Sequence, residues 1–398
     1  MKSYRGNRLH IAVLGRCNTG KSTLLNHLAG QDLALVSARP GTTGDPVPLA
    51  FELTPFGPVS FFDSPGMDEA SDLGLLRRKA GRKLLDGADM ALVVTDEQGL
   101  GPCEEELLAA LQERQTPFLL VFNKSDRHGN ATRAAMQTCQ ERGIAYLALA
   151  AALESDPTPL REAIIALTPA ACAAKTPLVI DLTPENAPVI CVTPIDASAP
   201  AGRLIAPQVQ VLRELVEHNR PVLVVQPQNL ARALTLLGEK AALVVSDSQA
   251  VREVADILPE DVQLTTFSVL FARHKGGFDS LLSGAGRIAT LEPGAALLVA
   301  EACAHHAQGD DIARVKLPAM LQKYLGHPLE FSFCSGRDFP DDLERFSLVL
   351  HCGACMLNRG EMRRRLQICA GLGVPVTNFG MAIATTQKLF DRIYAPLK

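Results

Sequence analysis

The chain contains no tryptophan, and aromatic residues of all kinds make up only 5% of it. Aromatic platforms on which nucleic-acid bases stack are therefore not expected. Basic residues are not in excess either, because the formal net charge is -4, which is unlike a nucleic-acid-binding protein. No apolar run reaches the roughly 18 residues of a membrane span, and the opening MKSYRGNRLH leads directly into an apolar strand. We expect a cytoplasmic protein with no nucleic-acid partner and no membrane association.

The composition and the pattern of apolar runs predict an α/β protein of several domains. Hydrophobic residues make up 47% of the 398 residues, enough for two or three packed cores. Short apolar runs alternate with helical patterns, which is typical of parallel α/β folds. The expected strands are residues 9–14, 59–62, 91–95, 118–122, 146–149, 222–225, 242–245, 296–300 and 348–350. A Pro- and Thr-rich segment at 168–188 and a less regular one at 274–290 indicate the boundaries. The predicted domains are 1–171, 172–275 and 276–398.

The sequence GRCNTGKS, residues 15–22, predicts a phosphate-binding P-loop. It follows an apolar strand and precedes a helical pattern, which is the setting that this motif requires. Glycines at positions 15 and 20 let backbone N–H groups approach phosphate oxygens, Lys21 would reach the β- and γ-phosphates, and Ser22 would bind Mg²⁺. The loop residues assigned to nucleotide binding are Gly15, Asn18, Gly20, Lys21, Ser22 and Thr23.

Three further motifs follow in the order expected of a GTP site. Asp63-Ser-Pro-Gly66 ends a strand and would place a carboxylate near Mg²⁺ and an N–H near the γ-phosphate. Asn123-Lys-Ser-Asp126 ends another strand, and an ionised aspartate accepts the two adjacent N–H donors of guanine, which adenine lacks. RPGTTGD, residues 39–45, supplies a threonine to the Mg²⁺ shell, with Thr43 favoured over Thr42. We therefore predict a GTPase that binds GTP or GDP and Mg²⁺. The residues assigned to hydrolysis are Lys21, Ser22, Thr43, Asp63 and Gly66, and those assigned to the nucleotide also include Thr42, Asn123, Lys124 and Asp126.

These motifs resemble the Era/TrmE-like group of GTPases in the translation-factor class. That resemblance implies that Asn18 helps to hold K⁺ and that K⁺ stimulates hydrolysis. Met67 stands where Ras-like enzymes have a glutamine that orients water, so slow intrinsic hydrolysis is expected. Gly44 replaces the arginine of the group's PGTTRD pattern, and Ala150 and Ala151 lie where backbone contacts to the base are expected.

Three of the ten cysteines are clustered with histidines at the ends of two expected strands. The sequences are EACAHH at 301–306 and HCGAC at 351–355. Parallel strands would bring Cys303, Cys352 and Cys355 to one edge of a sheet, where three thiolates can hold a metal centre. An iron-sulfur centre is favoured over zinc, and a redox-active CxxC or simple packing remain alternatives. The other cysteines are expected to pack as small apolar side chains: Cys17, Cys103, Cys139, Cys172, Cys191, Cys334 and Cys369.

Longer stretches over nearly the whole chain resemble the FeFe-hydrogenase maturation GTPases of the HydF family. They include VTPIDASAPAGRLIAPQVQ, FSVLFARHKG, EACAHH, DDIARVKLP, HCGACMLNR and GVPVTNFG. The resemblance implies a P-loop GTPase domain, a middle dimerisation domain and a C-terminal domain that binds a 4Fe-4S cluster. It also implies a carrier of the assembling di-iron subcluster, whose partners are the hydrogenase apoprotein, radical-SAM maturation enzymes and a second copy of the chain.

The same resemblance assigns the metal ligands by position. Cys303, Cys352 and Cys355 match the cluster cysteines of the family, and His305 and His351 match its motif histidines. The fourth ligand stays open, and His306 and Glu301 are also candidates for it.

Two other functions and one basic segment stay open at this stage. The chain could be an Era-like GTPase acting on RNA or the ribosome with a structural zinc site. It could also be a metal-binding storage or adaptor protein in which the nucleotide is only structural. The run RRR at 363–365 lies in a basic helix that is expected to face solvent, with docking of an acidic partner as the second interpretation.

Overall fold

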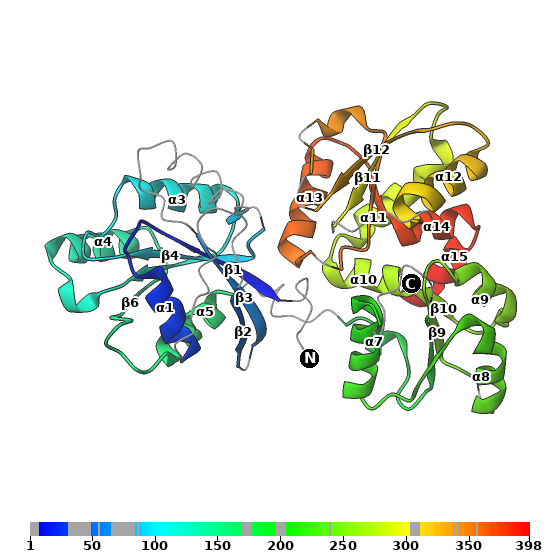
Figure 1. The fold of residues 1–398 in the computed structure, drawn as a ribbon, viewed down its shortest axis with the longest axis horizontal. Helices are drawn as coiled ribbons and strands as arrows, with labels where there is room; N and C mark the ends of the chain where they lie inside the picture. The colour runs from blue at the N-terminus through cyan, green and yellow to red at the C-terminus, as the bar shows by residue number, and fades with distance from the viewer. Residues whose placement is uncertain are drawn as a thin grey trace. The chain divides into compact units, whose positions relative to one another are not determined.

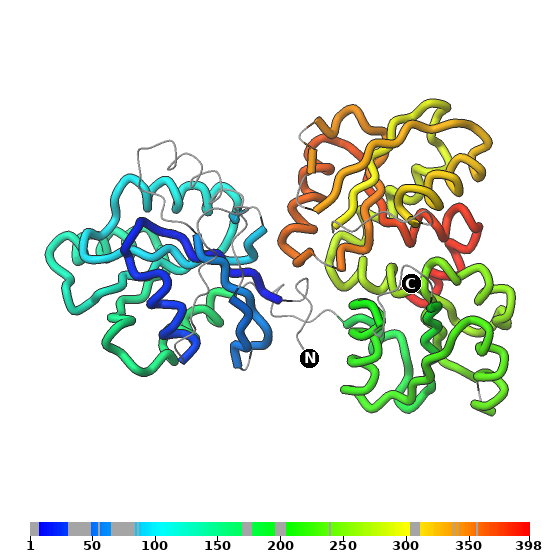
Figure 2. Tube along the Cα trace, viewed as in Figure 1, coloured from blue at the N-terminus to red at the C-terminus, as the bar shows by residue number. Residues whose placement is uncertain are grey.

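The computed structural model describes residues 8–30, 49–54, 56–64, 84–85, 87–168, 177–195, 204–238, 240–302, 311–336, 339–340, 342–355 and 357–398. The chain divides into two compact units. One comprises Met1–Ala174 and Asn358–Glu361, and the other comprises Lys175–Leu357 and Met362–Lys398. Figure 1 shows the helices and strands of each unit, and the chain trace can be followed in Figure 2.

The first unit is built on a six-stranded sheet in the order β2-β3-β1-β4-β5-β6. Only β2 and β3 are antiparallel, and all other neighbours are parallel. The strands are β1 (Leu9–Leu14), β2 (Leu49–Leu53), β3 (Gly57–Asp63), β4 (Met90–Thr95), β5 (Phe118–Phe122) and β6 (Tyr146–Ala148). The central strands β1 and β4 are buried along their whole length, as continuous apolar runs in a sheet covered on both faces should be.

Helices cover both faces of this sheet. The helices are α1 (Lys21–Ala29), α3 (Pro102–Glu113), α4 (Asn130–Glu141) and α5 (Thr158–Leu167). Leu24 of α1 and Leu160 of α5 belong to one apolar cluster, and Leu111 of α3 and Cys139 of α4 belong to another. The carboxyl ends of the parallel strands meet at one edge of the sheet, which is where α/β folds bind their ligands.

The second unit contains two four-stranded sheets in which all neighbours are parallel. The first has the order β10-β9-β7-β8, with β7 (Val189–Val192), β8 (Val222–Val225), β9 (Leu243–Ser246) and β10 (Leu264–Thr266). The second has the order β12-β11-β13-β14, with β11 (Ala296–Glu301), β12 (Glu330–Ser335), β13 (Leu348–His351) and β14 (Val376–Asn378). The described helices of this unit are α7 (Ala206–Glu217), α8 (Leu230–Leu237), α9 (Val251–Ile257), α10 (Phe267–Lys275), α11 (Phe278–Gly286), α12 (Leu317–Leu325), α14 (Phe379–Thr386), α15 (Phe390–Tyr394) and, from Met362 on, α13 (Arg359–Gly371).

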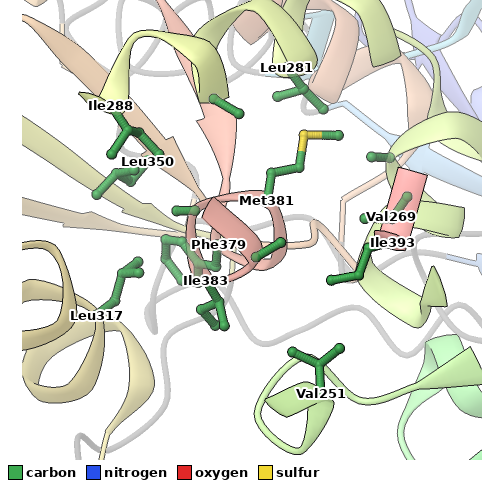
Figure 3. Packing of buried hydrophobic residues seen from close by; sticks show 14 of the residues in the cluster. Val251, Val269, Leu281, Ile288, Leu317, Leu350, Phe379, Met381, Ile383 and Ile393 are labelled. Atoms are coloured by element: carbon green, nitrogen blue, oxygen red, sulfur yellow. The ribbon is translucent and has the colours of Figure 1, made fainter. Parts of the chain in front are cut away.

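One large apolar core extends through both sheets of the second unit. Helices α10, α14 and α15 lie between the two sheets (Figure 1). Met381 of α14 is fully buried, and it shares one cluster with Val251 of α9 and Leu350 of β13. Figure 3 shows these side chains around α14. The segments on either side of residue 275 are therefore packed as one body, because their apolar side chains fill the same interior.

The structure confirms the α/β class and the strands expected from apolar runs, each to within about two residues at its ends. The segment 168–188 contains the short helix η3 (Ile180–Leu182) before β7 begins. In the segment 274–290, α10 ends at Lys275 and α11 begins at Phe278. In the part of the chain that the structure describes, no helix has the length and apolar character needed to cross a bilayer.

Candidate functional site

The loop between β1 and α1 has a backbone that requires glycine at two positions. Gly15 has φ +145°, and a Cβ there would lie 2.2 Å from the carbonyl oxygen of Val94. Gly20 has φ +88°, and a Cβ there would lie 2.3 Å from Nδ2 of Asn123. Both positions allow the loop to pack tightly against its neighbours in a conformation that L-residues rarely adopt. The helix α1 then starts at Lys21, so its N-terminal N–H groups lie at the end of the loop, as in anion-binding P-loops.

Lys21 is held over this loop by backbone carbonyls. Its side chain is only 8% exposed, and Nζ donates to the carbonyl oxygens of Gly15 at 3.0 Å and Arg16 at 2.6 Å. A phosphate group bound in the loop would therefore meet an ammonium group that is already in place. Asn18 and Thr23 are exposed on the same segment, and Asn18 adopts a left-handed backbone with φ +62°.

Ser22 and Asp63 are brought together, and they fit a magnesium ion. Ser22 Oγ donates to Asp63 Oδ2 at 3.2 Å, although the residues are far apart in the sequence. The other oxygen, Asp63 Oδ1, is buried without a hydrogen-bond partner among the described residues. Burial raises the pKa of Asp63, while Lys21 and the hydroxyl of Ser22 act in the opposite direction. A hard cation with oxygen ligands would satisfy the buried oxygen and hold the carboxylate ionised.

The segment after β5 lies against the same loop. Asn123 is 3% exposed, and its Nδ2 donates to the carbonyl of Thr19 at 2.9 Å. Its Oδ1 accepts from the backbone N–H of Ala151 at 3.1 Å, so one side chain joins three loops. Lys124 forms ion pairs with Asp96 at 3.4 Å and Glu97 at 3.7 Å.

Asp126 is exposed in the short helix η2 (Ser125–Arg127) at the end of β5. Its carboxylate is 3.5 Å from Nε of Arg127, which is itself exposed. An accessible carboxylate at the end of a parallel strand is available for the two N–H donors on the edge of guanine. The assignment of Asp126 to the base stays a prediction.

The loop after β6 holds its N–H groups in internal hydrogen bonds. The N–H of Ala150 donates to Glu154 Oε1 at 2.7 Å, and that of Ala151 donates to Asn123 Oδ1. A base contact through Ala150 would therefore compete with the carboxylate of Glu154. This carboxylate was not identified from the sequence, because a glutamate six residues beyond the end of a strand is usually just a solvated side chain.

Arg16 of the P-loop is a second residue that sequence reasoning missed. Its guanidinium donates to Glu104 at 2.6 Å and to Asp96 at 3.2 Å, and Glu104 is fully buried. Glu104 also accepts from the N–H of Gly101 and so caps α3. The arginine therefore links the P-loop to the segment between β4 and α3. A Gly-x-x-Glu spacing before a helical run is the signal that could have indicated the buried carboxylate.

A second candidate site lies at the end of β13. Strands β11 and β13 are adjacent and parallel, with Ala300 paired with His351, as expected from the positions of the two cysteine motifs. The N–H of Cys352 donates to the carbonyl of Ala300 at 2.9 Å, and the N–H of Ala302 donates to Sγ of Cys352 at 3.0 Å. A hydrogen bond from a backbone N–H to a cysteine sulfur is one of the protein's means of tuning an iron-sulfur cluster.

The loop that follows contains both cysteines of the CxxC motif. Ala354 has φ +52°, a left-handed backbone that is unusual for a residue with a Cβ. The side-chain nitrogen of Lys275, at the end of α10, donates to the backbone carbonyls of Ala354 and Leu357. Lys275 is 3% exposed, and it lines the same small pocket as Cys352. Sequence reasoning missed this lysine, although it belongs to the stretch FSVLFARHKG.

His351 is buried and bonded on both sides of its ring. Its exposed fraction is 1%, Nδ1 lies 2.8 Å from the carbonyl oxygen of Cys352, and Nε2 lies 3.1 Å from Nη1 of Arg365. Arg365 also donates through Nη2 to the carbonyl of Gly336 at 2.6 Å.

The expectation that the basic run 363–365 faces solvent is wrong for Arg365, which is 1% exposed. This side chain lies on the same face of α13 as the buried residues Met362, Leu366 and Cys369. The spacing of those apolar residues is the signal that could have shown it.

Several assigned residues lie outside the described part of the chain, and their assignments stay predictions. They are Thr42, Thr43, Gly66, Met67, Cys303, His305 and His306. Among the described residues, no three His, Cys, Asp or Glu side chains form a group that could hold a metal ion. Glu301, another candidate ligand, is 4% exposed and pairs with Arg314 at 3.1 Å.

Of the six isolated cysteines within the described ranges, three are buried as predicted and three are not. Cys139, Cys191 and Cys369 are buried, whereas Cys17, Cys103 and Cys334 are partly exposed, and Cys172 lies outside these ranges. Burial raises the pKa of Cys191 to about 12 and that of Cys369 to about 11. These two thiols stay protonated near neutral pH and are poor metal ligands.

Comparison with known protein families identifies three segments. Residues 10–124 match the 50S ribosome-binding GTPase family, residues 178–276 match the hydrogen maturase F dimerization domain, and residues 279–396 match the hydrogen maturase F tetramerization domain. The two maturase domains adjoin each other and follow the GTPase segment, in the order that the sequence motifs predicted.

Curated GTPases of the Era and Der types are similar to the GTPase part. GTPase Era of Caldicellulosiruptor saccharolyticus is 35% identical over 119 residues, which is 29% of this chain and 39% of that protein. GTPase Der of Rhizobium etli is 38% identical over 123 residues, which is 30% of this chain and 26% of that protein. The chain therefore spans well under half the length of these relatives. A crystal structure of Aquifex aeolicus Era bound to GDP and AlF4⁻ superposes with a TM-score of 0.35 and 20% identity, covering 60% of this chain and 99% of that chain.

Proposed function

Because this chain belongs to the hydrogen maturase F family, we propose that it is a GTP-hydrolysing scaffold for the maturation of FeFe-hydrogenase. Its C-terminal part would bind a 4Fe-4S cluster, carry the di-iron subcluster precursor and deliver it to the hydrogenase apoprotein. The observation that supports this most is the adjacency of β11 and β13, since Cys303 follows one strand and Cys352 begins the loop after the other. Three thiolates gathered there suit iron-sulfur chemistry, and a cluster with three cysteine ligands keeps one iron open to a labile ligand.

The residues near β13 fit such a cluster in their donor chemistry. Cys352 already accepts an N–H hydrogen bond from Ala302, and the CxxC loop is held by buried side chains. Cys303, Cys352 and Cys355 would hold the cluster, and His305 and His351 are the motif histidines of the proposed site. When bound, the cluster would supply an anchoring iron for the precursor. The protein's part is to hold the thiolates in place and to limit the access of water.

The nucleotide site supports GTP as the ligand. Lys21 would contact the β- and γ-phosphates, Ser22 and Asp63 would hold Mg²⁺, and Asp126 would select guanine. We propose that Thr43 completes the Mg²⁺ shell and that the Gly66 N–H binds the γ-phosphate. Hydrolysis is expected to be slow and to be stimulated by K⁺ held with the help of Asn18.

The two maturase domains also support self-association. We propose that residues 172–275 form a dimerisation domain, that residues 276–398 form the cluster-binding domain and that residues 1–171 form the GTPase domain. The matched domains are a dimerization and a tetramerization domain, so a homodimer that associates further is the proposed assembly. Radical-SAM maturation enzymes are the proposed source of the precursor.

The Era-like alternative has less support. An RNA- or ribosome-directed GTPase would be consistent with the match over residues 10–124. It does not account for the segments 178–276 and 279–396, both of which match maturase domains.

The test is activation of a hydrogenase apoprotein by purified variants. Cys352→Ser should abolish activation and leave GTP hydrolysis within about twofold of wild type, because the thiol and the P-loop belong to different compact units. Cys191→Ser is the matched control, since Cys191 is a fully buried cysteine in β7 and should leave activation unchanged if the protein folds. Equal loss of activation and hydrolysis in Cys352→Ser would contradict the proposal.

A further inference from the structure

We propose that Lys275 and Arg365 are positioning residues that fix the loop after β13 from two sides, at the described residues 351–355 and 357, and that His351 supports this loop and does not bind iron. The inference rests on the proposed cluster site. It concerns residues that the metal assignments left out, and it changes the role of one residue that they included.

Lys275 holds the far end of the loop. It is the last residue of α10, it is buried, and its Nζ donates to the carbonyl of Leu357 at 2.5 Å and to that of Ala354. Ala354 has a left-handed backbone, which is unfavourable for a residue with a Cβ, so its neighbours must stabilise it. The hydrogen bond from Lys275 Nζ to the carbonyl oxygen of Ala354 stabilises this conformation. The same amine lines a pocket together with Cys352, so it lies close to the candidate cluster site.

Arg365 holds the near end of the loop through His351. Its Nη1 lies 3.1 Å from His351 Nε2, and its Nη2 donates to the carbonyl of Gly336 at 2.6 Å. The guanidinium also lies 4.9 Å from the ring centre of Phe339, in the cation-π range. The side chain of Arg365 is therefore held in place by residues that follow β12 and by the last residue of β13.

Arg365 determines which nitrogen of the His351 ring carries the proton. An arginine side chain has only donors, so Nε2 must accept the hydrogen bond and cannot carry a proton. Nδ1 therefore carries the proton and donates to the carbonyl of Cys352 at 2.8 Å. Nδ1 is thus bonded to the backbone of Cys352, and Nε2 is bonded to the side chain of Arg365. Ligation of iron through Nε2 would break the bond to Arg365, and ligation through Nδ1 would break the bond to Cys352.

Gly277, just beyond Lys275, lies against a side chain of α13. Its φ is +83°, and a Cβ there would lie 2.1 Å from Cδ1, the flexible end of Leu366, the residue after Arg365. The segments that carry the two cations therefore pack against each other beside the loop. Placing two basic side chains in the interior is unfavourable unless they are well bonded, and three thiolates with a cluster would add negative charge to the site.

The experiment compares Arg365→Met and Lys275→Met with Arg363→Met, a control on the exposed face of the same helix. Each full-length protein is purified without oxygen and reconstituted with iron and sulfide. We expect the two test variants to lose iron to a chelator about 10–100-fold faster than the control, as for other substitutions around metal ligands. We also expect altered EPR g-values and a lower midpoint potential, because a positive charge near the cluster stabilises its reduced form.

Two further variants keep the test decisive. If Arg365→Met does not fold, as judged by circular dichroism, Arg365→Lys keeps the charge without the planar fork and should still lose iron faster than the control. Pulsed EPR detects a nitrogen atom bonded to iron as a strong coupling between that nitrogen nucleus and the electron spin of the cluster. Any such coupling in the wild-type spectrum should also be present in the spectrum of His351→Gln. Loss of that coupling in His351→Gln would overturn the assignment of His351.

The outcomes separate this inference from the proposed function. A wild-type protein that takes up no iron-sulfur cluster would overturn the proposed function, and the inference with it. A wild-type protein that carries the cluster, with test variants that match Arg363→Met in iron loss, EPR spectrum and potential, would overturn the inference alone.

Discussion

Asp63 shows how a residue at the nucleotide site is kept in an unfavourable state. One of its carboxylate oxygens accepts from Ser22, and the other is buried without a partner among the described residues. Its pKa is raised, chiefly by burial. For an acid this means that folding favours the protonated form. The stability it contributes is present below the ordinary pKa of aspartate and is lost as the pH rises through the raised value.

Asp63→Asn should therefore stabilise the nucleotide-free protein at pH 7, by on the order of 1 kcal/mol. The same change should abolish Mg²⁺-dependent binding of GTP, because the neutral amide cannot act as an anionic ligand. Urea unfolding without nucleotide, followed at pH 5 and pH 8, measures the first effect, and the gain should be larger at pH 8. Asp156→Asn is the control, and it should lower stability where Asp63→Asn raises it, because hydrogen bonding to Thr158 lowers the pKa of Asp156. A loss of stability in Asp63→Asn at pH 8 would contradict this account.

At the scale of single residues, the structure places Ser22 within hydrogen-bond distance of Asp63 and packs Asn123 against the loop that holds Lys21. These contacts could be expected from the sequence, because each motif lies at or after the end of a strand, and the roles of these residues in nucleotide binding stay predictions. Arg365 was not identified, because a basic run indicates charge but not burial. Its depth depends on packing against β12 and β13, which are distant in the sequence until the sheet forms.

At the scale of elements, the contact between α11 and β14 also depends on packing between segments that are distant in the sequence. A Cβ on Gly284 would lie 2.1 Å from the carbonyl oxygen of Val376 in β14, whereas a Cβ on Gly286 of the same helix would meet no atom within 4 Å. The helix can therefore lie directly on the backbone of the strand at one position only. The strand cannot give way, because it is hydrogen-bonded to β13.

Gly284→Ala should destabilise the protein by about 2 kcal/mol, the usual cost of overpacking a tight contact. Gly286→Ala should leave stability unchanged or raise it by up to about 1 kcal/mol, since alanine favours the helix and meets no obstacle. Chemical denaturation of the two variants side by side gives the comparison. Equal midpoints for both would show that α11 does not rest on β14 as described.

The strands that the sequence predicted best are long apolar runs. Strands such as β1, β4 and β5 are continuous apolar runs, and their positions were predicted closely. Five strands were not predicted: β2, β7, β10, β12 and β14. Strands β7, β10 and β14 are buried but only three or four residues long, whereas β2 and β12 lie at the edges of their sheets with side chains that are largely half-exposed or exposed. An edge strand is defined by pairing with its neighbour, which a local apolar pattern does not reveal.

At the scale of the whole molecule, the chain carries two candidate sites of different chemistry. Both lie where parallel strands end, and the proposed ligands are a nucleotide with Mg²⁺ at one and a thiolate-bound cluster at the other. This placement was predictable, because a motif directly after an apolar run is fixed to the end of a strand. The packing of both four-stranded sheets around one core was not, since it depends on contacts among helices α10, α14 and α15.

The measurement that tests the central claim most directly is the EPR spectrum of the reduced protein after anaerobic reconstitution with iron and sulfide, together with metal analysis. We predict about four iron atoms per chain and a signal of a reduced 4Fe-4S cluster in the wild type. The signal should be lost in Cys352→Ser and retained in Lys21→Ala, which should hydrolyse no GTP. Tightly bound zinc with no iron-sulfur signal, or a full signal in Cys352→Ser, would contradict the account.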